Sequence, residues 1–417
     1  MKALQKNLAA GLAALNGLHP AIRGEALLVN LEAGSGTLLL RATDYTVSVV
    51  ARVPCTADDS EVGMAVTVRA DLLGDFVRAM EATQEIKLEV DEKDKLVLRA
   101  AGHRATLKGA ALPVTLPEMD GEVVARVNAA LLRKAIGRVA YAAADRDGSR
   151  PAMTGVYLRL DGKKAVLAAA DGFRLAVQDL AVEYLLEEVV QAIIPARGME
   201  LLAHVLGGED ETVSLVLVPA ADGQYNLAIF QAGSVDLAIT LLGGVRYPDY
   251  EQVIPKESNI QIAVNAEELR RVLKVIAPFA EEDRPHHPVR LTLDNGEVTV
   301  HAGSSAYAEG QGVVPVQHQG PGAVVGLNAR YLWEALAGAS GEITVELLCQ
   351  GNGNGGPAVV NRPVTIRGAK DGWLAVVMPV VDERPAASAV AAPSAGPAAA
   401  AVPIVSVAPV PAAVAAA

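Results

Sequence analysis

The residues of this chain that could bind a metal ion do not occur at ligand spacing. His286 and His287 are adjacent, but no cysteine or acidic residue accompanies them at the spacing of a metal site, which favours a solvated loop pair. Cys55 and Cys349 lie far apart and predict neither a metal centre nor a disulfide framework. Two free, buried or half-buried thiols in a reducing compartment are the favoured interpretation.

A calcium loop is the second candidate. Asp145, Asp147 and Gly148 resemble part of one, but Val156 stands where the loop needs a bidentate glutamate. The ligand set is therefore incomplete. We predict no metal ion and no cofactor.

Motifs for catalysis are also missing from the sequence. It contains no Walker loop, no G-x-S-x-G, no H-E-x-x-H and no paired C-x-x-C. The glycine-rich run at Gly351–Gly356 joins two predicted strands, whereas a phosphate cradle needs a following helix N-terminus. We expect a flexible hairpin loop there, and a chain that is not an enzyme.

Basic residues recur at aligned positions of two predicted helices. Residues three and four apart share one helix face, so each helix can turn apolar residues to a sheet and cations to solvent. An ordinary solvated face explains one such helix, but the recurrence favours a shared basic surface. Dispersed cations without interleaved aromatic residues suit weak, sequence-independent contact with phosphates. The candidate residues are Arg133, Lys134, Arg138, Arg197, Arg270, Arg271 and Lys274.

Three predicted hairpins place these helices in a repeating frame. The hairpins span Leu27–Ala42, Val156–Ala169 and Val289–Ala302, and their turns contain G-S-G, D-G and N-G. Asp-Gly and Asn-Gly suit the positive φ angles of tight turns, and the flanking residues alternate as in half-buried strands.

A helix-like segment follows each hairpin, and another precedes the second and third. The following helices begin near Arg69, Ala196 and Asn328. The preceding helix repeats visibly, because V-N-A-A-L-L-R-K, which contains Asn128, returns as V-N-A-E-E-L-R-R, which contains Asn265. Both asparagines suit N-cap positions.

Each unit is thus α+β and of domain size, much longer than a solenoid repeat. We expect a first domain at 1–122, a central domain at 123–257 and a third domain at 258–381. The segment 382–417 is rich in alanine and proline and has no charge after Arg384, so we expect a disordered tail.

Composition limits the class of protein. Apolar residues make up 51% of the chain and charged residues 20%, which is enough to build packed cores. The net charge of −12 argues against a cationic coat that grips nucleic acid tightly, but it allows a local basic surface. No apolar run suits a signal peptide or a membrane span, so we expect a cytoplasmic protein without a membrane partner.

Four ordered motifs resemble one family, the bacterial DNA polymerase III β subunit or processivity sliding clamp. Arg150–Val177 is similar to its central hairpin and T-D-G-H-R-L-A motif, and Arg246–Pro255 to its R-F-P-D-Y-x-x-V-I-P linker. Leu327–Leu336 is similar to its last helix and Val376–Pro379 to its C-terminal strand. The first domain matches more loosely.

The resemblance implies a fold of three tandem DNA-clamp domains, each with two helices packed on antiparallel sheets, closing as a head-to-tail dimeric ring. It implies a homodimer that encircles duplex DNA without sequence preference and tethers the replicative polymerase, as a non-catalytic subunit of the holoenzyme. Arg150 lies in the loop that contacts DNA in the family. The further partners implied are the polymerase III α subunit, the clamp loader, and other polymerases and repair proteins.

The family binds apolar peptide motifs of these partners in a pocket between its second and third domains. Such a groove can accept peptide Leu and Phe side chains. Core packing is the alternative interpretation for most of the matching residues. They are Met153, Ala170, Gly172, Phe173, Arg174, Leu175, Pro248, Val253, Val376, Met378 and Pro379.

The chain departs from the family in places. The opening strand is nearly missing, Ala170 and Phe173 replace the family's Thr and His, and a long tail follows Pro379. Other hypotheses are a clamp-like scaffold dedicated to another replicon or repair partner, an unrecognised enzyme, and a structural β-rich repeat protein.

Overall fold

The computed structural model describes residues 1–20, 25–110, 114–119, 121–145, 150–208, 211–220, 223–280, 287–304, 308–349, 358–369 and 372–380. Several features singled out in the sequence fall outside these residues: Asp147, Gly148, His286, the run Gly351–Gly356 and the tail 382–417.

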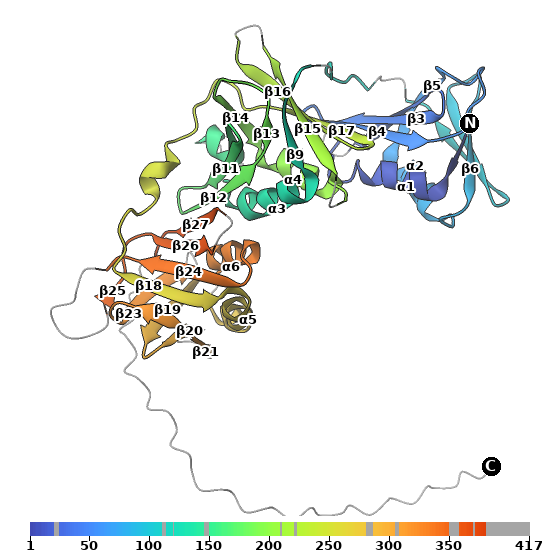
Figure 1. Cartoon of the computed structure of the whole chain (residues 1–417). Helices are drawn as coiled ribbons and strands as arrows, with labels where there is room; N and C mark the ends of the chain where they lie inside the picture. Colours follow the sequence, from blue (N-terminus) through green and yellow to red (C-terminus); the bar gives the residue numbers. More distant parts are fainter. Residues whose placement is uncertain are drawn as a thin grey trace, which may run out of the picture. The chain divides into compact units, whose positions relative to one another are not determined.

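The same order of elements occurs three times along the chain (Figure 1). The first domain contains β1 (Lys2–Leu4), α1 (Gln5–Ala13), β2 (Leu28–Ala33), β3 (Thr37–Thr43), β4 (Val47–Pro54), β5 (Ala65–Arg69), α2 (Ala70–Arg78), β6 (Glu85–Val90), β7 (Lys95–Ala100) and β8 (His103–Lys108). The opening strand, expected to be nearly missing, is present as β1 and pairs with β6.

The second domain repeats this order with short insertions. It contains β9 (Val123–Asn128), α3 (Ala129–Val139), the 3-10 turns η1 (Ala140–Ala142) and η2 (Pro151–Thr154), β10 (Gly155–Asp161), β11 (Lys164–Ala170), β12 (Arg174–Ala181), β13 (Glu183–Tyr184), β14 (Val190–Pro195), α4 (Ala196–Val205), β15 (Thr212–Pro219), β16 (Tyr225–Ala232), β17 (Val235–Thr240) and the linker turn η3 (Tyr250–Val253).

The third domain follows the linker. It contains β18 (Ile260–Asn265), α5 (Ala266–Ile276), η4 (Ala277–Phe279), β19 (Pro288–Asp294), β20 (Glu297–Ser304), β21 (Ala308–Pro315), β22 (Gln317–Gln319), β23 (Ala323–Asn328), α6 (Ala329–Gly338), β24 (Glu342–Leu347), β25 (Ala358–Val359), β26 (Val364–Gly368) and β27 (Trp373–Val377).

Local sequence signals account for these elements. The three predicted hairpins are present as β2–β3, β10–β11 and β19–β20. Gly162, Asn295 and Gly296 have positive φ angles in the turns, as the D-G and N-G signals require. The side chains of Asn128 and Asn265 accept backbone hydrogen bonds at the starts of α3 and α5, which confirms both predicted N-caps.

Each domain packs its two helices against two antiparallel sheets, and the helices of a pair contact each other (Figure 1). The first sheet of each domain has the strand order β1-β6-β7-β8, β9-β15-β16-β17 or β18-β24-β26-β27. The second has the order β5-β2-β3-β4, β14-β10-β11-β12 or β23-β19-β20-β21. Alternate residues of strands such as β2 point into aliphatic cores.

Sheets continue across both domain borders. The last strand of the second sheet of one domain pairs antiparallel with the last strand of the first sheet of the next, as β4 with β17 and β12 with β27. Two nine-stranded sheets result. Backbone hydrogen bonds therefore fix how neighbouring domains meet.

Arg138 reinforces the border between the second and third domains and is not on an exposed helix face. The residue is 3% exposed. Its Nε donates to the carbonyl of Gly338 at 2.7 Å, its Nη1 donates to Gln178 Oε1 at 3.0 Å, and its guanidinium lies over the ring of Trp373. The prediction that Arg138 faces DNA is wrong, because α3 turns this side chain toward the third domain.

We predict that Arg138→Ala lowers the free energy of unfolding by about 3 kcal/mol, because one buried and one partly buried acceptor lose their charged donor. Urea unfolding followed by tryptophan emission tests this, since Trp333 and Trp373 both lie in the third domain. Arg271→Ala, at an exposed position of α5, is the control and should change the value by less than about 0.5 kcal/mol. Equal effects of the two substitutions would contradict the assignment of Arg138 to the border.

Candidate functional site

The expected pocket residues meet where β12 pairs with β27, beside the linker between the second and third domains. Met153, Ala170, Leu175 and Val376 are buried and belong to one apolar cluster. The backbone N–H of Met378 donates to the carbonyl of Phe173 at 2.8 Å and holds the two ends of the pocket together. Segments far apart in the sequence therefore form one site.

The surface of this site is apolar and accessible. Phe173 and Met378 are exposed large hydrophobic residues joined through their backbones, and Gly172 is exposed beside Phe173. Pro248 is exposed and lines a groove with Met153, and Val253 is exposed in the linker turn η3. Pro379 is half-buried and forms an isolated bridge with Leu327. Four of the predicted residues are thus packed together in a buried cluster, whereas Gly172, Phe173, Pro248, Val253 and Met378 are exposed.

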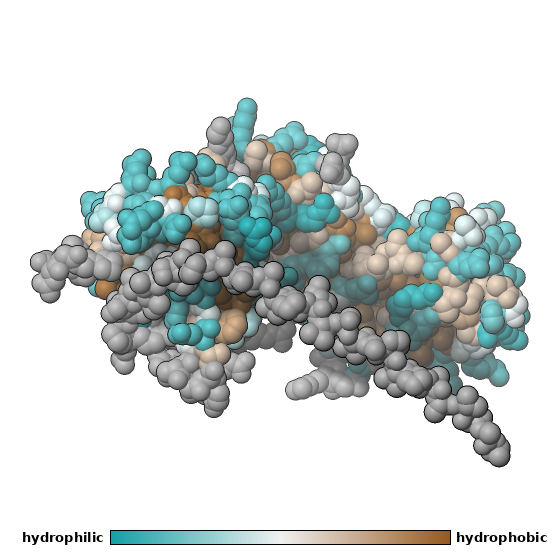
Figure 2. Space-filling view, turned by 90° about the horizontal axis from the view of Figure 1, so that it is seen from below, coloured by the Kyte–Doolittle hydropathy of each residue, from teal (hydrophilic) through white to brown (hydrophobic). Residues whose placement is uncertain are grey.

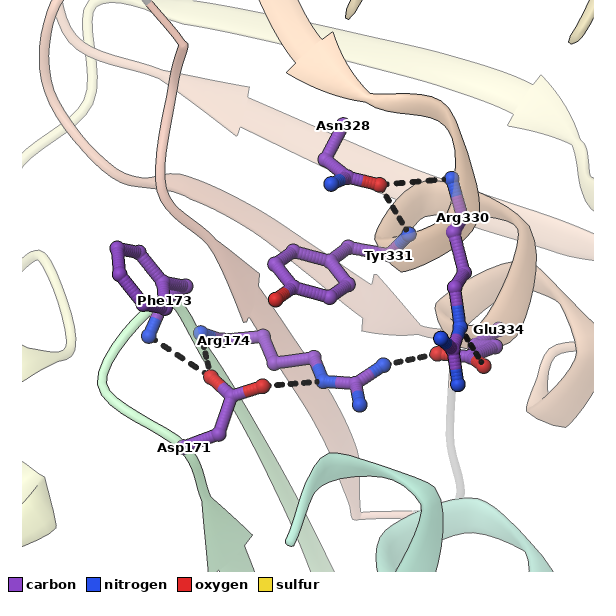
Figure 3. A network of polar contacts seen from close by, with 7 residues as sticks. All are labelled: Asp171, Phe173, Arg174, Asn328, Arg330, Tyr331 and Glu334. Carbon is purple, nitrogen blue, oxygen red and sulfur yellow. Dashed lines mark hydrogen bonds and ion pairs between the residues drawn. The ribbon is translucent and has the colours of Figure 1, made fainter. Parts of the chain in front are cut away.

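The turn before β12 is shaped by Asp171. Its Oδ1 accepts the backbone N–H groups of Phe173 at 2.8 Å and Arg174 at 3.0 Å, and Gly172 has a φ of +96° (Figure 3). A side chain at position 172 would be strained at this φ. The turn therefore presents Phe173 outward while Arg174 points to the third domain.

Arg174 is a buried tie between domains, with a side chain 8% exposed. Its guanidinium donates to Asp171 Oδ2 at 2.9 Å and to Glu334 of α6, between which it lies in Figure 3. It also lies 4.4 Å from the ring centroid of Tyr331. Because the guanidinium is hydrogen-bonded to two carboxylates and its flat face packs on Tyr331, Arg174 holds the turn before β12 against α6.

Sequence reasoning missed Tyr331 and Glu334 as parts of this site. Asn328 caps α6 by accepting the N–H groups of Arg330 and Tyr331, so the first turn of α6 is held beside the pocket (Figure 3). The sequence predicted a helix start near Asn328, which the structure confirms, but it did not indicate that the first turn of this helix lies at the site. The link from Arg174 to Glu334 spans 160 residues and has no local signal.

The tyrosines near this site have raised pKa values because they are buried. Burial raises the pKa of Tyr141, which also lies beside Arg174, and raises the pKa of Tyr331. In the linker, burial raises the pKa of Tyr247 and raises that of Tyr250 to about 12. These phenols stay neutral at physiological pH, so the pocket surroundings have no tyrosinate charge.

The remaining predicted cations differ in exposure. Arg133, Lys134, Arg150, Arg271 and Lys274 are exposed. Arg197 is half-buried, and its Nη2 donates to Asp44 at 2.6 Å and to the carbonyl of Gly17 at 2.7 Å, which ties α4 to the first domain. In Figure 2 hydrophilic residues cover much of the visible face and hydrophobic residues form patches between them.

No group of His, Cys, Asp and Glu that could hold a metal ion is found among the residues that the structure describes. In that same part of the chain, no helix has the length and apolar character needed to span a bilayer. Cys55 is half-buried and Cys349 buried, and both are free thiols.

Three domain models of one protein family match the chain in order. The N-terminal domain of the DNA polymerase III beta subunit matches residues 26–115, the central domain 126–249 and the C-terminal domain 251–351. The order agrees with the three domains seen in the fold, while the particular boundaries at 122 and 257 stay predictions.

Curated relatives and solved structures agree with these matches. The beta sliding clamp of Pseudomonas aeruginosa is 29% identical over 303 residues, which cover 72% of this chain and 78% of the relative. The beta sliding clamp of Streptomyces coelicolor is 28% identical over 84% of this chain and 90% of the relative. The crystal structure of the DNA polymerase sliding clamp from Pseudomonas aeruginosa has a TM-score of 0.78 at 25% identity and covers 91% of this chain and 99% of that one.

We predict that Arg174 and Glu334 are energetically coupled. Arg174→Gln and Glu334→Gln should each lower the free energy of unfolding by roughly 1–3 kcal/mol, and the double variant should lose about 1–2 kcal/mol less than the sum. Arg330 and Glu334 form the matched comparison, because Arg330 is 68% exposed and such pairs couple by only about 0.5 kcal/mol. Additive losses at Arg174 and Glu334 would show that the buried pair does not tie the domains.

Proposed function

Because the chain belongs to the family of DNA polymerase III β subunits, the DNA sliding clamps, we propose that two copies close head to tail into a ring around duplex DNA. The observation that carries the proposal is the pairing of sheets across both domain borders. The same kind of border occurs twice in the chain. One strand edge of the first domain and one of the third domain therefore remain without the partner that the corresponding strands have at the borders.

These edges are β8 in the first domain and β21 in the third. β8 occupies the place that β17 and β27 occupy in the other domains, and β21 occupies the place of β4 and β12. Among the residues that the structure describes, β8 pairs only with β7 and β21 only with β20. The same rule of pairing applied between two chains joins β21 of one copy to β8 of the next. Two such contacts close a ring in which neither β8 nor β21 remains an edge strand.

Side chains near the two edges suit this contact. Val313 of β21 is an exposed large hydrophobic residue, and so is Phe279, whose ring lies over Gly310 in that strand. Val275 is exposed on α5, the helix that packs against β21. β8 carries Arg104 and Lys108, whereas the one charge of β21 is Glu309. Burial of these apolar side chains would stabilise the contact. The opposite charges of β8 and β21 would favour contact between a β8 edge and a β21 edge over contact between two identical edges.

Weak contact with DNA is sufficient for a ring, because attachment is topological. Arg133 and Lys134 of α3, and Arg271 and Lys274 of α5, are exposed cations on helices and are proposed to face the duplex. Arg270, also on α5, is half-buried and is proposed to contact the duplex as well. Their number is small and the net charge is −12, which suits a clamp that slides rather than grips.

The apolar site between the second and third domains is proposed to receive peptide motifs of the polymerase III α subunit, the clamp loader and other polymerases and repair proteins. Part of the site is packed in a buried cluster, and Phe173, Val253 and Met378 are exposed, which suits insertion of peptide Leu and Phe side chains. The chain itself then needs no catalysis: it acts as the non-catalytic subunit of a polymerase holoenzyme. The cytoplasmic location stays a prediction, as does the use of this clamp by the main replicon.

We predict that the chain is a dimer in solution and that Val275→Glu converts it to monomers at micromolar concentration, because a carboxylate would be buried at the contact in place of an apolar side chain. Light scattering after size exclusion gives the mass. Val359→Glu is the matched control, since Val275 is 62% exposed and Val359 is 60% exposed at the opposite edge of the sheet. A wild-type monomer, or a Val275→Glu dimer, would contradict closure through this surface.

We predict that Met378→Glu weakens binding of a polymerase-tail peptide at least about 50-fold while the mass stays dimeric, because the site would present a charge to an apolar side chain. Fluorescence polarisation with a labelled peptide measures the affinity. Val359→Glu serves again as an exposed control. Unchanged peptide affinity in Met378→Glu would place the peptide elsewhere.

A further inference from the structure

One face of the sheet β1-β6-β7-β8 in the first domain is strongly basic. Ile86, Leu88, Leu96 and Leu98 are fully buried and point from the other face into the core. The alternate residues lie on the outer face, since successive side chains of a strand point to opposite sides. The charged residues of this outer face are Lys2, Glu85, Lys87, Glu89, Lys95, Arg99, Arg104 and Lys108. Six of these eight side chains are basic, in a chain whose net charge is −12.

Four of these cations form one row across the four strands, which we call the cationic row. Lys2 of β1 lies opposite Lys87 of β6. Lys87 lies opposite Arg99 of β7, which in turn lies opposite Arg104 of β8. Residues directly opposite in antiparallel strands point to the same face with about 5 Å between their Cβ atoms, and like charges there repel each other. An anion bound along the cationic row would relieve this repulsion.

Nearby carboxylates leave much of the cationic row available to a ligand. Glu89 is shared by Lys87 and Arg99, at N–O distances of 2.5 and 3.3 Å. The side chains of Lys87 and Arg99 remain 46% and 47% exposed, and ion pairs at such exposure are weak. Arg104 is exposed, and no ion pair is found for it within the described residues. Phosphate groups can therefore compete for these cations.

An open hollow of about 420 Å³ lies at the cationic row. Its lining includes all four cations of the row, the turn between β7 and β8, and Glu85, which pairs with Lys2 at 3.0 Å. Among the described residues that line it, none is Trp, Tyr, Phe, Leu, Ile, Val or Met. Protein partners usually gain affinity from large side chains that fill apolar pockets, and this surface offers no such pocket. Dispersed cations on a polar face suit the phosphates of a nucleic acid backbone instead.

The corresponding rows of the other two domains differ in charge. The row of the second domain has one cation and one acid: Arg126, Ser214, Gln231 and Asp236. The row of the third domain has one cation: Ala263, Thr344, Arg367 and Leu374. Arg367 is paired with Glu346 at 2.9 Å. The cationic row is thus a property of the first domain and does not follow from the repeated fold.

We propose that the cationic row binds the phosphate backbone of duplex DNA without sequence preference, as a second DNA contact separate from the helices proposed to face an encircled duplex. The row spans three strand spacings of about 4.8 Å, or about 14 Å, which is the axial length of about four phosphates along one DNA strand. The contact needs only the sheet of the first domain and does not depend on ring closure. It allows the chain to hold a DNA segment other than the one that it encircles.

The test uses the full-length chain and a fluorescently labelled, covalently closed duplex minicircle, with no loading protein present. A closed protein ring cannot thread onto this DNA, so any binding reports surfaces outside the hole. Fluorescence anisotropy gives the affinity at several salt concentrations. The logarithm of the affinity should fall with the logarithm of the salt concentration with a slope of about −3, which corresponds to three or four phosphate contacts.

The variant that carries both Lys87→Gln and Arg99→Gln removes the centre of the cationic row. Its slope should be about −1, and its affinity at low salt should fall at least about tenfold, because two phosphate contacts are lost. The control carries Lys163→Gln and Lys256→Gln, which remove the same charge at two exposed cations outside the row. Its affinity should stay within about twofold of wild type.

Failure of wild type to bind the minicircle at low salt would overturn the proposal, as would equal losses in the row variant and the control. Loss of binding in Arg133→Gln with Lys134→Gln, but not in the row variant, would also overturn it and place the contact on α3. A polyglutamate chain that binds the row more tightly than the duplex would assign the row to an acidic protein instead of DNA. Row-dependent binding by a chain of monomeric mass would support this proposal and contradict the ring.

Discussion

The structure depends on one constraint, the need of each sheet to pair its last strand. An open strand edge exposes a row of N–H and C=O groups that readily pairs with another strand. This chain satisfies the constraint twice internally, through β4 with β17 and β12 with β27, and leaves β21 and β8 as matching ends. Domain order, the site at the second border and the proposed ring all follow from it.

Buried polar contacts between the second and third domains favour one way of packing them together. Arg138 and Arg174 come from the second domain, and each reaches a backbone carbonyl or carboxylate of the third, at Gly338 and Glu334. Buried charges are costly unless they are fully paired, so these contacts favour one arrangement of the two domains. The apolar site is formed by residues on both sides of this border, and it depends on the same contacts.

Local signals predicted much of the fold. The hairpin turns, the N-caps at Asn128 and Asn265 and the repeated helix were visible because turn and capping chemistry is local. Long-range partners were not visible: Arg138 has the spacing of an exposed cation, and only the third domain packed against α3 shows why it is buried. The pocket set came from a family resemblance, and its division into buried and exposed residues, like the roles of Tyr331 and Glu334, required the structure.

In the proposed ring, attachment to DNA is topological. The most direct measurement is the lifetime of the loaded protein on a nicked circular plasmid, before and after one restriction cut, with salt held constant. A closed ring should stay on the circle for long and slide off the ends rapidly once the plasmid is linear, because the exposed cations alone hold DNA weakly. Equal lifetimes on circular and linear DNA would contradict a closed ring.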